Sequence, residues 1–189
     1  MINGVIFDIG GVLIDDPQFK SFWGESKKGA ELRELFGTGK ISREGFVKDG
    51  AHIIGVSPDI FLTQYIEAYS QMKRIPQTME VFNSINKQKY IFSDTNPIHL
   101  EICQKLFPEI FESSSKQFLS YEMKLRKNSN KAFQLMLNNL PYKAHELIFI
   151  DNNPNYIETA KSLGLNTILF NAECNLTKSL LQIDQNMFD

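Results

Sequence analysis

Three residues with reactive side chains, Asp8, Ser93 and Asp151, each follow directly after a short run of apolar residues. A fourth, Lys127, lies between the second and the third. A carboxylate, a hydroxyl and an ammonium group gathered in one place can bind and attack an electrophilic centre. One polar residue after a strand says little, because such loops are commonly polar. Three of them, with a lysine, predict a ligand site at the carboxyl ends of neighbouring strands.

The apolar runs before these residues predict a parallel sheet. Runs of about four apolar residues without alternation are typical of strands that are buried on both faces. Segments with helical spacing, an N-cap or a terminal Pro or Gly separate the runs, so the expected fold is α/β, a doubly wound parallel sheet. We expect strands at 5–7, 90–92, 108–113, 147–150 and 167–170, and helices at 97–106, 130–140 and 155–163.

The segment 17–75 is too long for a single crossover between the first two strands. It predicts three helices, at 31–36, 42–54 and 57–73, the last with the N-cap pair Ser57-Pro58. We interpret the segment as a small helical cap, with hinges at Asp15-Asp16-Pro17 and Ile75-Pro76. The core domain is then 1–16 together with 76–189, and the cap is 17–75.

Four motifs stand out along the chain, VIFDIGGVL (5–13), FSDTN (92–96), SYEMKLRKN (120–128) and FIDNN (149–153). In their order and spacing they resemble the motifs of the haloacid dehalogenase (HAD) superfamily. The match extends over the chain outside the insertion, and the position of the cap resembles the helical-cap subgroup, with its glucose-1-phosphate phosphatase-type and epoxide hydrolase-like phosphatases. Each motif alone is a weak signal, whereas the set of four is specific.

The resemblance implies a Mg²⁺-dependent phosphatase. Asp8 would attack phosphorus and form an aspartyl-phosphate. Mg²⁺, which prefers oxygen ligands, would be held by Asp8, Asp151 and the backbone carbonyl of Gly10. The phosphate would be bound by Asp8, Ser93, Asp94 and Lys127. Lys124 and Lys131 are the alternatives to Lys127 if the third motif is displaced.

Two departures from the pattern bear on activity. Gly10 stands where these phosphatases usually carry a second aspartate that protonates the leaving group, and Asn152 stands where many have another aspartate. General acid–base catalysis contributes about 10²–10⁴ in rate, so its loss would slow such an enzyme without abolishing activity. Candidate substitutes are Asp15, Asp16, Asp94 and His99, although each is also a common surface or capping residue.

These departures motivate further hypotheses. The first alternative is a weak or inactive HAD-like protein that binds a phospho-ligand or a protein partner. A second is a true haloacid dehalogenase, whose halide leaves without a proton. We rank it low because Asp151-Asn152 resembles the metal-binding fourth motif of phosphatases, and because Arg33, Arg43 and Arg74 are interpreted as solvated charges. A third is a substrate whose leaving group departs readily, such as an acyl phosphate. Phe19, Phe22 and Trp23 are candidate pocket residues, although packing is the commoner role.

Composition excludes several classes. The 189 residues carry 20 basic and 22 acidic side chains without a long basic run, which argues against a nucleic-acid partner. No apolar stretch reaches the roughly 20 residues that span a bilayer, and two isolated cysteines suggest reduced thiols in the cytoplasm. The expected partner is a small phosphorylated metabolite; the sequence names neither that metabolite nor an oligomeric state.

Overall fold

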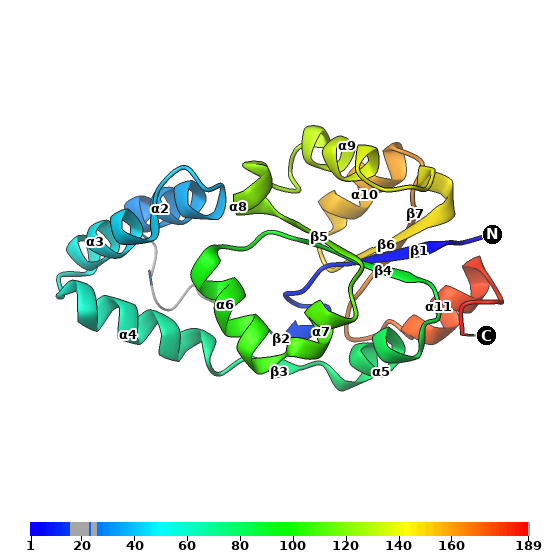
Figure 1. Cartoon of the computed structure of the whole chain (residues 1–189), viewed down its shortest axis with the longest axis horizontal. Coiled ribbons are helices and arrows are strands. Elements are labelled where there is room, and N and C mark those ends of the chain that lie inside the picture. Colours follow the sequence, from blue (N-terminus) through cyan, green and yellow to red (C-terminus); the bar gives the residue numbers. More distant parts are fainter. Residues whose placement is uncertain (16–22, 24–25, 189) are drawn as a thin grey trace.

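A five-stranded parallel sheet runs through the computed structural model, which describes residues 1–15, 23 and 26–188 (Figure 1). The spatial order is β5-β4-β1-β6-β7. The chain adds strands on one side of β1 and then on the other, so the strand order reverses at β1, where ligands bind in such sheets. The strands are β1 (Gly4–Phe7), β4 (Gln88–Ser93), β5 (Lys116–Leu119), β6 (Leu147–Asp151) and β7 (Asn166–Leu169).

Helices cover both faces of this sheet, as a doubly wound fold requires. Successive side chains of a strand point to opposite faces, so Val5 and Phe7 pack into one apolar cluster and Ile6 packs into the other. The first cluster lies under α5 (Pro76–Ser84), α6 (Pro97–Leu106), α7 (Pro108–Glu112) and α11 (Leu176–Ile183). The second lies under α9 (Asn130–Asn138) and α10 (Pro154–Ser162).

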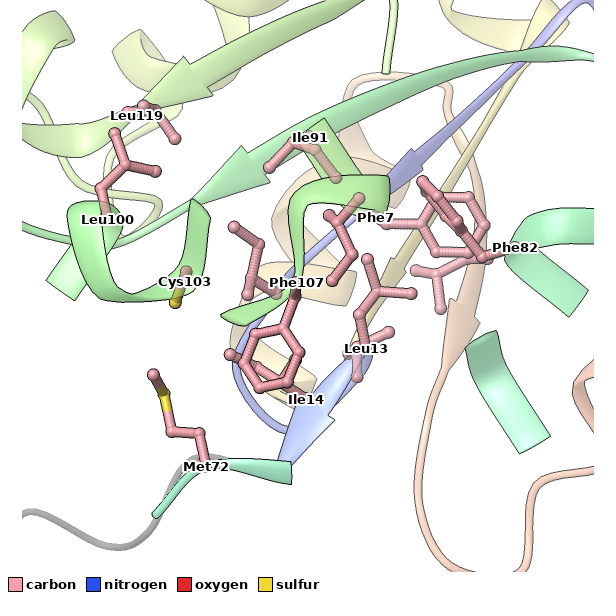
Figure 2. Close-up of a cluster of buried hydrophobic side chains, with 14 of the residues drawn as sticks. Phe7, Leu13, Ile14, Met72, Phe82, Ile91, Leu100, Cys103, Phe107 and Leu119 are labelled. Atoms are coloured by element: carbon pink, nitrogen blue, oxygen red, sulfur yellow. The ribbon is translucent and has the colours of Figure 1, made fainter. Parts of the chain in front are cut away.

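Part of the first cluster is drawn in Figure 2. The rings of Phe7 and Phe82 meet edge to face, with centroids 5.1 Å apart. Phe107 lies beside Ile14, directly below the sheet. These side chains are almost fully buried, so they hold the chain firmly where it leaves β1. The α/β doubly wound fold expected from the apolar runs is confirmed.

One element was predicted wrongly. Residues 108–113 were expected to form a strand, but Pro108–Glu112 is helix α7. Pro108 occupies the first helical turn, where its missing N–H costs nothing. The strand comes later, at Lys116–Leu119, and pairs with β4. The helix expected at 57–73 is also shorter, because it ends at Tyr69.

Between β1 and α5 the described residues form a two-stranded antiparallel ribbon and three helices. The ribbon pairs β2 (Ile14–Asp15) with β3 (Lys73–Arg74) at the two ends of the insertion. Asp15 of the predicted hinge lies in this ribbon, whereas Asp16 and Pro17 fall outside the described residues. The helices are α2 (Lys27–Gly37), α3 (Arg43–Ile54) and α4 (Pro58–Tyr69), capped by Ser26, Ser42 and Ser57.

An aromatic cluster holds these helices together. Phe46 of α3 stacks on Phe36 of α2, with ring centroids 4.1 Å apart, and meets Phe61 and Tyr65 of α4 edge to face. Trp23 packs against Phe46 and Phe61, so it belongs to this cluster, while Phe19 and Phe22 lie outside the described residues. The aromatic cluster is continuous with the apolar cluster that contains Phe7. That the three helices act as a separate cap domain stays a prediction.

The insertion packs against the core at several places. The hydroxyl of Ser120, at the start of α8 (Ser120–Met123), donates to the carbonyl oxygen of Gly37 at 2.7 Å. Tyr69 stacks on the ring of His99 in α6, with centroids 4.4 Å apart. Figure 1 shows α2, α3 and α4 at one end of the molecule, beyond α6 and α8. None of the helices in the described part of the chain is both long and apolar enough to cross a bilayer.

Candidate active site

The carboxyl ends of three adjacent strands converge at one edge of the sheet. Asp8 follows β1 at the centre, Ser93 ends β4 on one side, and Asp151 ends β6 on the other. The backbone N–H of Asp8 donates to the carbonyl oxygen of Ile150 at 3.0 Å and extends the pairing of the two strands. All three side chains are buried or nearly so. The structure therefore brings together the three residues singled out by their positions after apolar runs.

Lys127 joins two of these residues directly. Its Nζ atom lies 2.9 Å from Oδ1 of Asp8 and 2.5 Å from Oδ2 of Asp151. The side chain is only 1% exposed, so both ion pairs are shielded from water. The rival lysines, Lys124 and Lys131, are both exposed. The geometry therefore selects Lys127 as the lysine of this site.

The loop after α8 delivers Lys127 to this position. Lys124 adopts a left-handed conformation with φ 57° and ends α8. The backbone N–H of Lys127 then donates to Oδ1 of Asp94 at 3.1 Å. The ammonium group lies over the ring of Tyr156 at 5.2 Å from the centroid, an attractive arrangement for a cation. The backbone and the side chain of Lys127 are thus both fixed by this site.

Burial and mutual charge interactions shift the pKa values of Lys127, Asp151 and Asp94. Burial acts against the charge on Lys127, but Asp8, Asp151 and Asp94 outweigh burial and hold its pKa above the usual value. Burial raises the pKa of Asp151 to about 6, against the attraction of Lys127, and the negative charge of Asp8 adds to the rise. Burial likewise raises the pKa of Asp94. Three carboxyl groups around one lysine leave negative charge that is not fully compensated.

Backbone N–H groups orient the two carboxylates that contact Lys127. The N–H of Ile9 donates to Oδ1 of Asp8 at 2.8 Å, and the N–H of Asn153 donates to Oδ1 of Asp151 at 2.8 Å. Gly11 closes the turn after Asp8 with φ 75°, a conformation that favours glycine. A Cβ atom on Gly11 would lie 2.1 Å from the side-chain nitrogen of Asn152. Asn152 therefore packs directly on the turn that carries the aspartate and Gly10.

The donor set of this site fits a small divalent cation. Mg²⁺ is usually bound through one or two carboxylates, with other oxygen ligands completing the shell. Asp8 and Asp151 supply two carboxylates on one lysine nitrogen, and their uncompensated charge favours a cation. The described residues hold no cluster of three or more His, Cys, Asp or Glu side chains arranged for a metal ion. Such a site would therefore depend on oxygens of the backbone, of water and of the substrate.

A cleft opens beside these charged groups. It has a volume of about 350 Å³, the size of a pocket for a small metabolite. One wall comes from the insertion and the other from the loops of the sheet edge, at Asp94, next to Ser93, and at Arg126, next to Lys127. The lining residues are Ala30, Arg33, Glu34, Gly37, Tyr65, Tyr69, Asp94, Thr95, Asn96, His99 and Arg126.

His99 lines this cleft but is poorly suited to proton transfer. It is buried, and burial lowers its pKa to about 4, so the ring is neutral at pH 7. Its Nδ1 lies 2.8 Å from Oγ1 of Thr95, and its Nε2 lies 3.2 Å from the sulfur of Met72. These contacts fix Thr95 in the cleft wall. Asp15 is exposed on β2, so among the described substitutes for the missing acid only Asp94 borders the charged cluster.

Several residues of the site carried no readable signal in the sequence. Tyr156 donates its hydroxyl proton to Oδ2 of Asp94 at 3.2 Å. Arg126 pairs with Glu34 of α2 at 2.5 Å. Arg33 was interpreted as a solvated charge, which is wrong, because it is half-buried in the cleft wall. Arg43 and Arg74 do form exposed ion pairs on the surface, with Glu101 and Glu109.

The fold is that of HAD family enzymes. No family model matches the sequence. Similar structures include a HAD family enzyme of Bacteroides thetaiotaomicron, with 23% identity over 95% of this chain and 98% of that one, at a TM-score of 0.80. A HAD-like family hydrolase of Porphyromonas gingivalis gives 20% identity over 97% and 98%, at 0.78. An L-2-haloacid dehalogenase of Xanthobacter autotrophicus gives 17% identity over 99% and 84%, at 0.67.

The fold resemblance predicted from the four motifs is thereby confirmed. The Bacteroides enzyme was crystallised with magnesium, and also with magnesium and inorganic phosphate together. The Xanthobacter dehalogenase was crystallised with chloropropionic acid covalently bound. Proteins that share this fold have therefore been crystallised with two different kinds of ligand.

Proposed function

We propose that this protein is a Mg²⁺-dependent hydrolase that removes phosphate from a small phosphorylated metabolite. The observation that carries the proposal is the position of Lys127 Nζ between the carboxylates of Asp8 and Asp151. A nucleophilic carboxylate needs compensating positive charge to approach an anionic phosphoryl group. The magnesium and phosphate complexes of the structurally similar Bacteroides enzyme support this choice of cation and substrate.

In this mechanism Asp8 is the nucleophile. A carboxylate oxygen of Asp8 forms a bond to phosphorus, the bond from phosphorus to the ester oxygen breaks, and the leaving oxygen takes up a proton. Water then attacks the phosphorus of the aspartyl-phosphate, releasing inorganic phosphate and regenerating Asp8. Lys127 and Ser93 bind the transferring oxygens and hold the phosphoryl group in line.

Mg²⁺ would be held by Asp8, Asp151 and the carbonyl oxygen of Gly10. When bound, it neutralises charge on the phosphoryl oxygens. Asn152 differs from the aspartate that many relatives carry, and it removes one negative charge near this position. We therefore expect a weaker affinity for Mg²⁺ than in a protein with two aspartates there.

Gly10 supports a second candidate function, that of a weak or inactive family member that binds a phospho-ligand or a protein partner. The second aspartate that protonates the leaving group in related phosphatases has no counterpart at this position. Its absence corresponds to about 10²–10⁴ in rate, or roughly 3–5 kcal/mol. A substrate with a good leaving group, such as an acyl phosphate, would reduce that cost. The two cysteines favour the cytoplasm, which stays a prediction.

The proposal is tested by measuring phosphate release from a panel of phosphorylated metabolites, with and without Mg²⁺. The Asp8→Asn variant keeps the size of the side chain and removes the nucleophile, so we expect the rate to fall by about 10⁴-fold or more. Asp15→Asn is the matched control, because it makes the same chemical change at an exposed position in β2. Full activity of Asp8→Asn would overturn the assignment. No release from any substrate by the folded protein would favour the second candidate.

A further inference from the structure

One face of α2 forms a wall of the cleft. Ala30, Arg33, Glu34 and Gly37 all line it, at the spacing that places helical residues on one face. The opposite wall includes Asn96, the N-cap of α6, and Thr95 just before it. The N-terminal end of a helix carries a partial positive charge, which favours anions. The cleft therefore brings an arginine of the insertion opposite the positive end of a core helix.

The two arginines of the cleft differ in how their charges are compensated. Arg126 forms an ion pair with Glu34 at 2.5 Å and lies 3.9 Å from Oδ2 of Asp94. It also donates to the carbonyl oxygen of Arg33 at 3.3 Å. Both acidic side chains of the cleft wall are thus close to Arg126. Its charge is already compensated by the protein.

Among the described residues, Arg33 forms no ion pair of this kind. Its Nε atom is buried, and no residue in the described part of the chain accepts a hydrogen bond from it. A buried donor without an acceptor destabilises the protein, so such groups are normally paired. The planar guanidinium suits a carboxylate or a phosphate, because it can donate two parallel hydrogen bonds. Because Arg33 lines the cleft, an anionic group bound there can accept hydrogen bonds from its guanidinium.

We propose that Arg33 binds a second anionic group of the substrate, either a carboxylate or a further phosphate. The inference rests on the proposed phosphatase function and narrows its substrate class. The reacting phosphoryl group lies at Asp8 and Lys127, and the rest of the substrate extends along the cleft past Asp94 to α2. The volume of about 350 Å³ limits that substrate to a small metabolite. Arg33 is a specificity residue in this arrangement, and the nucleophile remains Asp8.

The test compares pairs of phosphoesters that differ only in the second anionic group. Glycerol 3-phosphate and 3-phosphoglycerate differ by a carboxylate, and fructose 6-phosphate and fructose 1,6-bisphosphate differ by a phosphate. For the preferred anionic member we expect Arg33→Gln to lower kcat/KM by about 10–100-fold, mainly through KM. The member of that pair without the second anionic group should change by less than about twofold. The two pairs separate a carboxylate ligand from a phosphate ligand.

Two further variants keep the test interpretable. Arg43→Gln removes the same charge from α3, where Arg43 forms an exposed ion pair with Glu101 outside the cleft. We expect it to leave all four substrates unchanged. Arg33→Lys retains the charge but not the planar fork, so it should recover only part of the loss. An equal loss on both members of a pair, or no loss on either, would overturn the inference.

The outcome also separates this inference from the proposed function. If no phosphate release depends on Asp8, the function fails, and calorimetric binding of 3-phosphoglycerate and fructose 1,6-bisphosphate decides the inference alone. Weaker binding of either by Arg33→Gln than by the native chain would uphold recognition by Arg33. Unchanged or absent binding of both would overturn it. Release of chloride from 2-chloropropionate, dependent on Asp8, would overturn both the function and the substrate class.

Discussion

The proposed phosphoryl site, formed by Asp8, Asp151 and Lys127, and the cleft beside it are formed by different parts of the fold. Asp8 and Asp151 are positioned by strand ends and converge on Lys127, which is almost fully buried. The cleft is formed where the insertion meets the core, and its walls carry half-exposed side chains such as Arg126 and Glu34. A sheet edge fixes a few groups rigidly enough for chemistry, whereas a boundary between two packed units leaves room for a varied substrate. Under the proposed function, the reaction takes place in the first region and substrate selection in the second.

The largest effect is expected from breaking the first region at Lys127. The Lys127→Met variant keeps the length of the side chain and removes the charge between Asp8 and Asp151. Removal of one partner from a buried ion pair costs about 3–5 kcal/mol, and the pKa of Asp151, already raised to about 6 by burial, should rise further. We expect phosphate release to fall by about 10³-fold and the melting temperature to drop, both measured against the native chain.

Added Mg²⁺ provides the control for that variant. A divalent cation at the two carboxylates would replace part of the lost positive charge. Mg²⁺ should therefore raise the melting temperature of Lys127→Met more than that of the native chain. Lys131→Met makes the same change at an exposed lysine and should alter neither activity nor melting. A Lys127→Met protein with native activity would show that the ion pairs are not part of the reaction site.

The sequence predicts the first region far better than the second. A buried strand is recognisable from a run of apolar residues, and the parallel sheet then brings Asp8, Ser93 and Asp151 to one edge. No local sequence pattern predicts the cleft, because it forms where α2, with Arg33, faces residues that lie far away in the sequence. The misplaced strand at 108–113 has a different, local origin, since Pro108 occupies the first turn of helix α7. Tertiary packing decides the cleft, whereas a local signal decides the helix.

The buried ring of His99, in the cleft wall, makes the stability of the protein depend on pH. Burial lowers its pKa from 6.5 to about 4, so between these values the unfolded chain binds a proton that the folded chain does not. Stability is therefore unaffected by this group above pH 6.5 and falls as the pH drops from 6.5 towards 4, by about 3 kcal/mol in all. Urea unfolding across this range measures the slope.

Substitution isolates the contribution of that ring. His99→Gln should lower stability at pH 7, since the packing against Tyr69 is lost, but its stability should depend less on pH between 6.5 and 4. His145→Gln, at an exposed position, should retain the native slope. An unchanged slope in His99→Gln would mean that other groups cause the acid destabilisation. The cleft wall would then contribute no titration in this range, unlike the reaction site, where burial raises the pKa of Asp151 to about 6.

The smallest effect concerns the contact that joins the two regions. Gly39, just after α2, has φ 62°, and a Cβ atom there would lie 2.3 Å from the backbone oxygen of Tyr121. Gly55, after α3, has φ 76° but open space around the same position. Gly55→Ala should therefore cost about 1 kcal/mol for its backbone conformation alone, whereas Gly39→Ala should cost about 3 kcal/mol because α2 must also shift from the core.

Measuring kcat and KM of the two glycine variants tests whether the cleft selects the substrate without taking part in the reaction. A shift of α2 moves Arg33 and Glu34 but leaves the ends of β1 and β6 in place. Gly39→Ala should therefore raise KM severalfold with little change in kcat, and Gly55→Ala should change neither. If kcat fell as steeply as KM rose, the cleft would be part of the reaction machinery, since movement of its wall would then disturb Asp8 and Lys127 as well.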